Sequence, residues 1–114
     1  MKQKEDNIIV KKTFEFSCNI LDLYSKLIEI KKFRIADQLC RSGTSIGANV
    51  REAQRAVSRA DFINKMGIAL KEAEETQYWF ELTEAKIFEI DNKVKNDLSA
   101  ILKILTSIIN SSKN

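Results

Sequence analysis

The sequence predicts an all-α protein, an antiparallel up-down-up-down four-helix bundle, from three observations. The chain has 114 residues with no proline and only three glycines, so it lacks the turn residues that successive strands require. Apolar residues recur at helical spacing over four long segments. Short connections join these segments, and such helices fold most simply as a bundle. We therefore expect one domain over residues 1–114, with helices at 8–32, 34–57, 59–86 and 92–110.

The first predicted helix, 8–32, follows Asn7, which is a candidate N-cap. Two apolar rows run along it. The first row is Val10, Phe14, Leu21, Tyr24 and Ile28, and the second is Phe16, Ile20, Leu23, Leu27 and Ile30. A surface helix of a monomer needs only one apolar stripe. Two interpretations stay open: a wide face toward the core, or a second face that contacts another subunit.

The second predicted helix, 34–57, has its apolar residues in one narrow stripe at about 100° per residue. The stripe is Ile35, Leu39, Ile46, Val50, Ala53 and Val57. The stripe keeps its phase through Gly43, which predicts one long helix. The alternative is that a shorter helix ends at Gly43. Glycine inside a helix costs about 1 kcal/mol relative to alanine. We expect Cys40, Gly43 and Gly47 to lie where another helix backbone comes close.

The third predicted helix, 59–86, opens with Ser58 as N-cap and Asp61 at N3, a variant of the capping box. Its expected inner face is Phe62, Met66, Ala69, Ala73, Gln77 and Phe80. Asp91 or Asn92 can cap the fourth helix. The seam of that helix is Val94, Leu98, Ile101, Leu105 and Ile108, at alternating steps of three and four. From Asn110 onward the tail is polar, and we expect it to fray.

Several kinds of chemistry are missing from the sequence. Without histidine, the chain cannot form a Ser-His or Cys-His pair or a histidine metal site. Cys18 and Cys40 have no metal-ligand spacing and are interpreted as small buried side chains. Glu72 and Glu75 are interpreted as a solvated face. We predict no enzyme, no catalytic residues, no cofactor, no metal and no small-molecule substrate. We also expect no membrane segment and no signal peptide, since residues 1–6 are charged, and hence a cytoplasmic protein.

The charged residues are segregated between the second and third helices. The net charge is +3, from 19 basic and 16 acidic residues. Residues 31–59 carry a net charge of +5 and residues 60–91 a net charge of −5. The candidate contact residues of the basic segment are Arg34, Arg41, Arg51, Arg55 and Arg59. Three hypotheses remain: pairing with the third helix of the same subunit, pairing with a neighbouring subunit, or contact with RNA phosphates.

Residues 41–53, RSGTSIGANVREA, strongly resemble the bacterial "four helix bundle protein" family. These proteins are also known as ribosomal-RNA intervening-sequence proteins, and some are encoded within insertions in 23S rRNA genes. The resemblance continues through residues 58–63, 68–76 and 78–79, and residues 13–16 also match. Many relatives have proline where Gly47 stands and glycine where Ala53 stands. Here we therefore expect a more regular second helix.

The resemblance implies a four-helix bundle that assembles as a homopentameric ring. Distant relatives are the accessory proteins of diversity-generating retroelements, basic pentamers that bind nucleic acid and a reverse transcriptase. No catalytic residues carry over. The expected function is an oligomeric binding module for RNA or an RNA-bound protein. The alternative is a scaffold whose basic and acidic helices mediate self-assembly only.

Three polar residues of the matched segment are interpreted as structural rather than as a ligand site. Ser45 and Asn49 lie beside the apolar stripe. Polar side chains in such a position are expected to be partly buried and hydrogen-bonded to another helix. Glu52 lies nearer the arginines, and we expect it to pair with Arg55 or Arg59.

Overall fold

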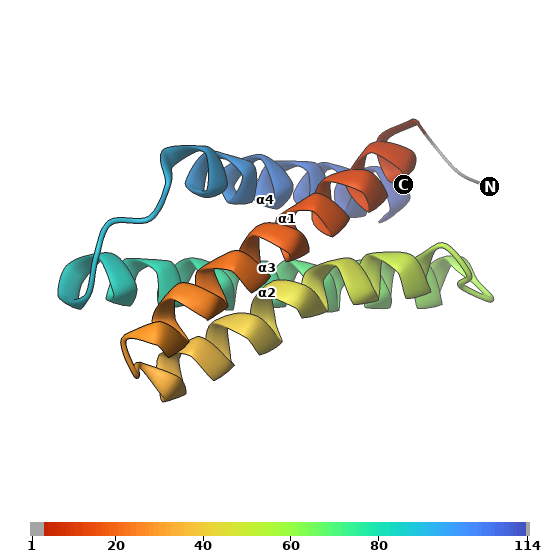
Figure 1. Cartoon of the computed structure of the whole chain (residues 1–114). Helices are drawn as coiled ribbons and strands as arrows, with labels where there is room; N and C mark the ends of the chain where they lie inside the picture. The colour runs from red at the N-terminus through yellow and green to blue at the C-terminus, as the bar shows by residue number, and fades with distance from the viewer. Residues whose placement is uncertain (1–3, 114) are drawn as a thin grey trace.

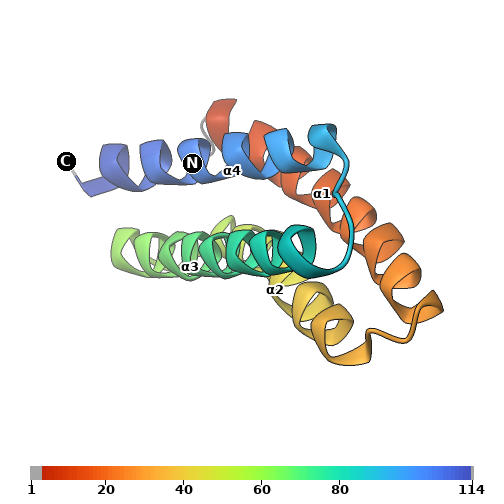
Figure 2. The ribbon, with the colours of Figure 1, turned by 90° about the vertical axis from the view of Figure 1, so that its left-hand side faces the viewer.

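The computed structural model describes residues 4–113, and the side chains of residues 8–113. Its helices are α1 (Lys4–Glu29), α2 (Phe33–Ala53), α3 (Arg59–Lys86) and α4 (Asn92–Lys113). Successive helices run antiparallel, each packs on the next, and α4 packs back on α1 (Figure 1). α1 runs obliquely to α3 and α4 (Figure 2). The predicted all-α four-helix architecture is confirmed, and the described part of the chain contains no strand.

Close approach of α1 and α2 depends on two glycines inside α2. A Cβ atom at Gly43 would lie 2.7 Å from Cγ1 of Ile20, which is fully buried. A Cβ atom at Gly47 would lie 3.3 Å from the carbonyl oxygen of Thr13. α2 is one continuous helix through Gly43, as predicted. Because the two glycines have no side chains, Ile20 packs directly on Gly43 and the backbone of Thr13 lies close to Gly47.

The core is built mainly from one of the two apolar rows of α1. Within the second row, only Ile30 is exposed. The remaining four residues of this row, together with Ile9, are buried. The ring of Phe16 lies 6.1 Å from that of Phe80 on α3. In the first row, Phe14 is 54% and Leu21 is 51% exposed, so a wide core face does not account for these two residues.

α1 ends earlier than predicted because of a local backbone motif. Lys31 has a left-handed backbone with φ of 64°. Its N–H donates to the carbonyl of Ile28, and the N–H of Lys32 donates to the carbonyl of Leu27, both at 2.9 Å. This pair of bonds is a Schellman motif, in which glycine is the usual left-handed residue. The prediction that the helix continues to Lys32 is therefore wrong.

Three other helix ends also differ from the prediction. α1 begins at Lys4, so Asn7 is not its N-cap. α2 ends at Ala53, and Val57 is 92% exposed. After this point the backbone N–H groups donate to carbonyls three residues earlier instead of four, as in the bond from the N–H of Ala56 to the carbonyl of Ala53. α4 is helical to Lys113, so the expected fraying from residue 110 is not found.

The expected capping residues of α3 and α4 are found. Ser58 Oγ accepts the N–H of Asp61 at 3.0 Å, and Asp91 Oδ1 accepts the N–H of Lys93 at 2.7 Å. On the inner face of α3, however, Thr76 is buried and Gln77 is exposed. The inner face of α3 is thus rotated slightly from the predicted one.

Candidate nucleic-acid interface

The five candidate arginines form three separate groups rather than one stripe. Arg34 lies at the beginning of α2 and Arg41 near its middle. Arg51, Arg55 and Arg59 surround the turn between α2 and α3, and we call these three residues the basic end. At 1.5 Å per residue, Arg34 and Arg51 are ~25 Å apart along the helix axis. One short ligand therefore cannot contact both.

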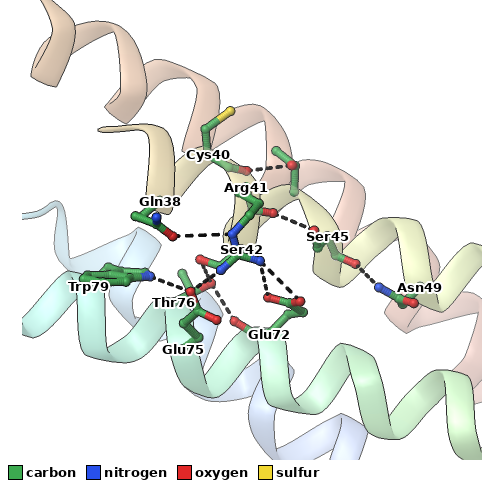
Figure 3. Close-up of polar contacts among 11 residues, drawn as sticks. Gln38, Cys40, Arg41, Ser42, Ser45, Asn49, Glu72, Glu75, Thr76 and Trp79 are labelled. Atoms are coloured by element: carbon green, nitrogen blue, oxygen red, sulfur yellow. Dashed lines mark hydrogen bonds and ion pairs between the residues drawn. The ribbon is translucent and has the colours of Figure 1, made fainter. Parts of the chain in front are cut away.

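Arg41 pairs with the acidic helix of its own subunit (Figure 3). Its Nη1 lies 3.2 Å from Oε1 of Glu72, and its Nη2 donates to Oε2 of Glu75. Its Nε donates to Oε1 of Gln38 at 3.4 Å. Nε1 of Trp79 donates to the same Glu75 oxygen at 3.0 Å. Among the three hypotheses for the arginines, pairing within the subunit holds for Arg41.

The carboxylate of Glu75 is held in its charged form. Hydrogen bonds from Trp79 and Arg41 lower the pKa of Glu75 below its ordinary value. The same contact raises the pKa of Arg41, mainly through the hydrogen bond to Glu75. Glu72 and Glu75 thus belong to a fixed ionic cluster with Arg41, rather than only to a solvated face.

A buried polar contact lies beneath this cluster (Figure 3). Oγ1 of Thr76 is 2.8 Å from Oγ of Ser42 and 2.7 Å from the carbonyl oxygen of Glu72. Both hydroxyl residues are fully buried. Sequence reasoning missed this contact, although Ser42 and Thr76 each fall among the apolar positions of their helices. It fixes α2 against α3 at the level of Arg41.

At the basic end, Arg51 lies against α1, whereas Arg41 contacts α3. Its guanidinium carbon is 5.3 Å from the ring centroid of Phe14. An exposed cation–π contact of this kind contributes about 0.5–1 kcal/mol. Arg51 therefore covers part of the exposed apolar row of α1 while its charge remains at the surface.

Arg55 and Arg59 are exposed and make no ion pair with any described residue. The prediction that Glu52 pairs with one of them is wrong. Oε1 of Glu52 instead accepts from Nζ of Lys65 at 2.9 Å. Because α3 supplies this lysine, no carboxylate among residues 8–113 pairs with either guanidinium group. Arg34 is likewise exposed and has no ion pair within the described part of the chain.

Hydrogen bonds hold the turn between Arg55 and Arg59 in one conformation. Ser58 caps α3 by accepting the N–H of Asp61. Asp61 in turn accepts the N–H of Val57 on Oδ2 at 3.2 Å. The N–H of Arg55 donates to the carbonyl of Glu52 at 3.0 Å. The turn therefore presents two guanidinium groups from fixed backbone positions, and guanidinium geometry suits a phosphate group.

The side chains of Ser45 and Asn49 form hydrogen bonds within α2 (Figure 3). Oγ of Ser45 donates to the carbonyl of Arg41 at 2.6 Å, and Nδ2 of Asn49 donates to the carbonyl of Ser45 at 2.9 Å. The predicted hydrogen bonds to another helix are therefore wrong. A helical side chain commonly bonds back to a carbonyl four residues earlier. Both hydrogen bonds lie within α2 and do not connect it to another helix.

Metal-binding side chains are not gathered in the described residues. No group of three or more His, Cys, Asp or Glu side chains there could hold a metal ion. Cys18 is exposed, which contradicts the expected burial, and Cys40 is half-buried. In the described range, none of the helices combines the length and apolarity needed to cross a bilayer.

Comparison with known proteins places the chain in a family. The sequence model of the family described as "23S rRNA-intervening sequence protein" matches residues 5–111. A crystal structure of a protein of unknown function from the S23 ribosomal protein family of Bacteroides thetaiotaomicron is 49% identical. The similarity covers 93% of this chain and 98% of that one, with a TM-score of 0.87. No curated protein matches the chain. The chain therefore belongs to the 23S rRNA-intervening sequence protein family.

Proposed function

We propose that this protein is a non-enzymatic, oligomeric module that binds RNA through its basic end. The observation that carries this proposal is that Arg55 and Arg59 are exposed without a carboxylate partner among the described residues. They flank a turn that Ser58 and Asp61 hold in place. Phosphate is the ligand whose charge and geometry best match such a pair of guanidinium groups.

The contacts of the basic end should be with the RNA backbone rather than with bases. Sequence-specific RNA recognition uses exposed aromatic rings or base-edge hydrogen bonds. The ring of Phe14, which contacts this end, already has one face toward the guanidinium group of Arg51. Phosphate contacts position a nucleic acid without reading its sequence. We therefore expect little preference among RNA sequences.

We further propose that the protein assembles as a homopentameric ring, in which the first apolar row of α1 contacts a neighbouring subunit. This proposal is supported by the family resemblance and by the exposure of Phe14 and Leu21, at 54% and 51%. A ring presents several copies of the basic end, which raises the apparent affinity for one long RNA. In light scattering, Leu21→Asp should lower the mass. Lys26→Gln makes the same change of charge on an exposed position of α1 away from this row, and it should not lower the mass.

A self-assembly scaffold is the second candidate, favoured by the position of Arg51 over that same row. If the arginines join subunits, Arg55→Glu should dissociate the oligomer. If they bind RNA, the Arg55→Glu variant should keep the mass of the wild type and lose RNA affinity. Light scattering of this one variant separates the two functions.

RNA binding is tested by the slope of log affinity against log salt concentration for a fluorescent single-stranded RNA. Removal of one phosphate contact makes this slope shallower by about 0.7 for single strands. We expect that change for Arg55→Gln and for Arg59→Gln. Arg34→Gln, which removes the same charge from the far end of α2, is the control and should leave the slope unchanged. Absence of binding at low salt would refute the proposal.

A further inference from the structure

We propose that Glu72 and Glu75 determine where RNA can lie, by holding Arg41 away from phosphate and confining contact to the basic end. This inference rests on the proposed function and assigns a specificity role to residues outside the basic end. The relevant juxtaposition is the cluster of Arg41, Glu72, Glu75 and Trp79 between α2 and α3 (Figure 3).

Arg41 is accessible but already occupied. Its side chain is 48% exposed, so burial does not keep it from a nucleic acid. Both of its terminal nitrogens contact carboxylates, and its Nε contacts Gln38. A phosphate would therefore have to displace Glu72 and Glu75 together before Arg41 could bind it.

The two carboxylates are themselves fixed in position. Trp79 donates its indole N–H to Glu75, which prevents that side chain from simply turning away. The backbone carbonyl oxygen of Glu72 is 2.7 Å from the hydroxyl oxygen of buried Thr76. The cluster is thus supported from beneath, and the carboxylates are presented to any ligand that approaches the middle of α2.

The charge of the cluster favours repulsion of phosphate over a purely stabilising role. One carboxylate is enough to neutralise Arg41, and exposed ion pairs contribute only about 0–1 kcal/mol. The second carboxylate reverses the sign, giving three charges with a net value of −1. An RNA backbone that follows α2 from the basic end therefore meets a negative group near Arg41. At the basic end it meets Arg55 and Arg59, which make no ion pair within residues 8–113.

The test is the Glu72→Gln/Glu75→Gln double variant, measured with the same single-stranded RNA. In this variant Arg41 is free to make one additional phosphate contact, which should make the slope of log affinity against log salt concentration steeper by about 0.7. The affinity of the variant should then fall about 2.6-fold more than that of the wild type between 50 and 200 mM salt. Adding Arg41→Gln should abolish this difference. The control is Glu74→Gln/Glu81→Gln, which removes two exposed α3 charges that make no ion pair among the described residues.

The outcomes separate this inference from the proposed function. If the wild type binds RNA and the double variant has the same slope, or the control shows the same gain, the inference is wrong and the proposed function stands. If only the double variant binds, Arg41 is restrained as inferred but the basic end is insufficient. If neither binds, both are wrong.

A single variant keeps the inference testable if the double variant does not fold. Arg41→Gln in the wild-type background should leave the salt slope unchanged, because a restrained Arg41 makes no phosphate contact. A slope shallower by about 0.7 would show that Arg41 binds RNA directly and would overturn the inference.

Discussion

Replacing Gly43 with alanine tests the close helix crossing that places α1 against α2. The added Cβ would lie 2.7 Å from Cγ1 of Ile20, 2.8 Å from its Cδ1 and 3.0 Å from its Cγ2. Ile20 is fully buried, so it cannot turn into solvent. Overpacking of this kind costs about 1–3 kcal/mol. Alanine returns about 1 kcal/mol through helix propensity. We therefore expect Gly43→Ala to lower the free energy of unfolding by up to about 2 kcal/mol.

The other two glycines serve as matched controls for the same substitution. Gly67 is also helical, but a Cβ there meets nothing within 4 Å, so Gly67→Ala should stabilise by about 1 kcal/mol. Gly47→Ala should fall between the two, because its Cβ would lie 3.3 Å from the carbonyl oxygen of Thr13. Urea unfolding followed by circular dichroism, at one protein concentration, measures all three.

The clash with Ile20 can be isolated by a double-mutant cycle. Ile20→Ala should cost less stability in the Gly43→Ala background than in the wild type, since it removes the overlapping atoms. If Gly43→Ala instead stabilises the protein as much as Gly67→Ala, the close contact between α1 and α2 does not exist. The account of the core would then be wrong.

Three further predictions concern helix ends and pH. Lys31→Gly should stabilise by about 1 kcal/mol, because glycine relieves the left-handed strain, and an unchanged urea midpoint would contradict this. Ser58→Ala should destabilise by about 1 kcal/mol through loss of the α3 cap, whereas Ser25→Ala, on an exposed helical position, should not. Lys95 and a backbone N–H lower the pKa of Glu84. Its contribution to stability is present above the unfolded pKa of about 4.3 and is lost as the pH falls through the folded value. Glu84→Gln should therefore lose less thermal stability than the wild type between pH 7 and pH 3, and equal losses would refute this assignment.

Periodicity predicted the course of α2 but not its end. The apolar stripe keeps its phase on both sides of Gly43, and this is sufficient to indicate one helix. Val57 fits the same phase, yet it lies beyond the helix and is almost fully exposed. The phase of the apolar stripe indicates only which face of the helix a residue would occupy if the helix continued. The end of α2 depends instead on the cap that Ser58 and Asp61 build for the next helix.

The arginines show a similar limit for the candidate site. The sequence reveals the opposite net charges of its two segments, which is why pairing with α3 was one of the hypotheses. It does not reveal that Arg41 contacts α3 whereas Arg51 contacts α1. Nor does it show that Glu52 pairs with Lys65 instead of with the neighbouring arginines. Those assignments depend on how the helices are rotated against one another.

The sequence is compatible with either a core face or an intersubunit face for the first apolar row of α1. The structure places Phe14 and Leu21 outside the core, because the buried row begins at Ile9 and passes through Thr13, which no apolar pattern marks. The hydroxyl of Thr13 donates to the carbonyl of Ile9 at 2.7 Å. A buried threonine satisfied in this way interrupts the apolar pattern without interrupting the core.

Hydrogen exchange of the protein with and without bound RNA tests the central claim most directly, because it locates the contact surface. The account predicts that RNA slows exchange at residues 54–61, where the backbone turns between α2 and α3, and leaves the middle of α2 near Arg41 unchanged. Slower exchange around Arg41 or along the Phe14 face, with no change at residues 54–61, would contradict it.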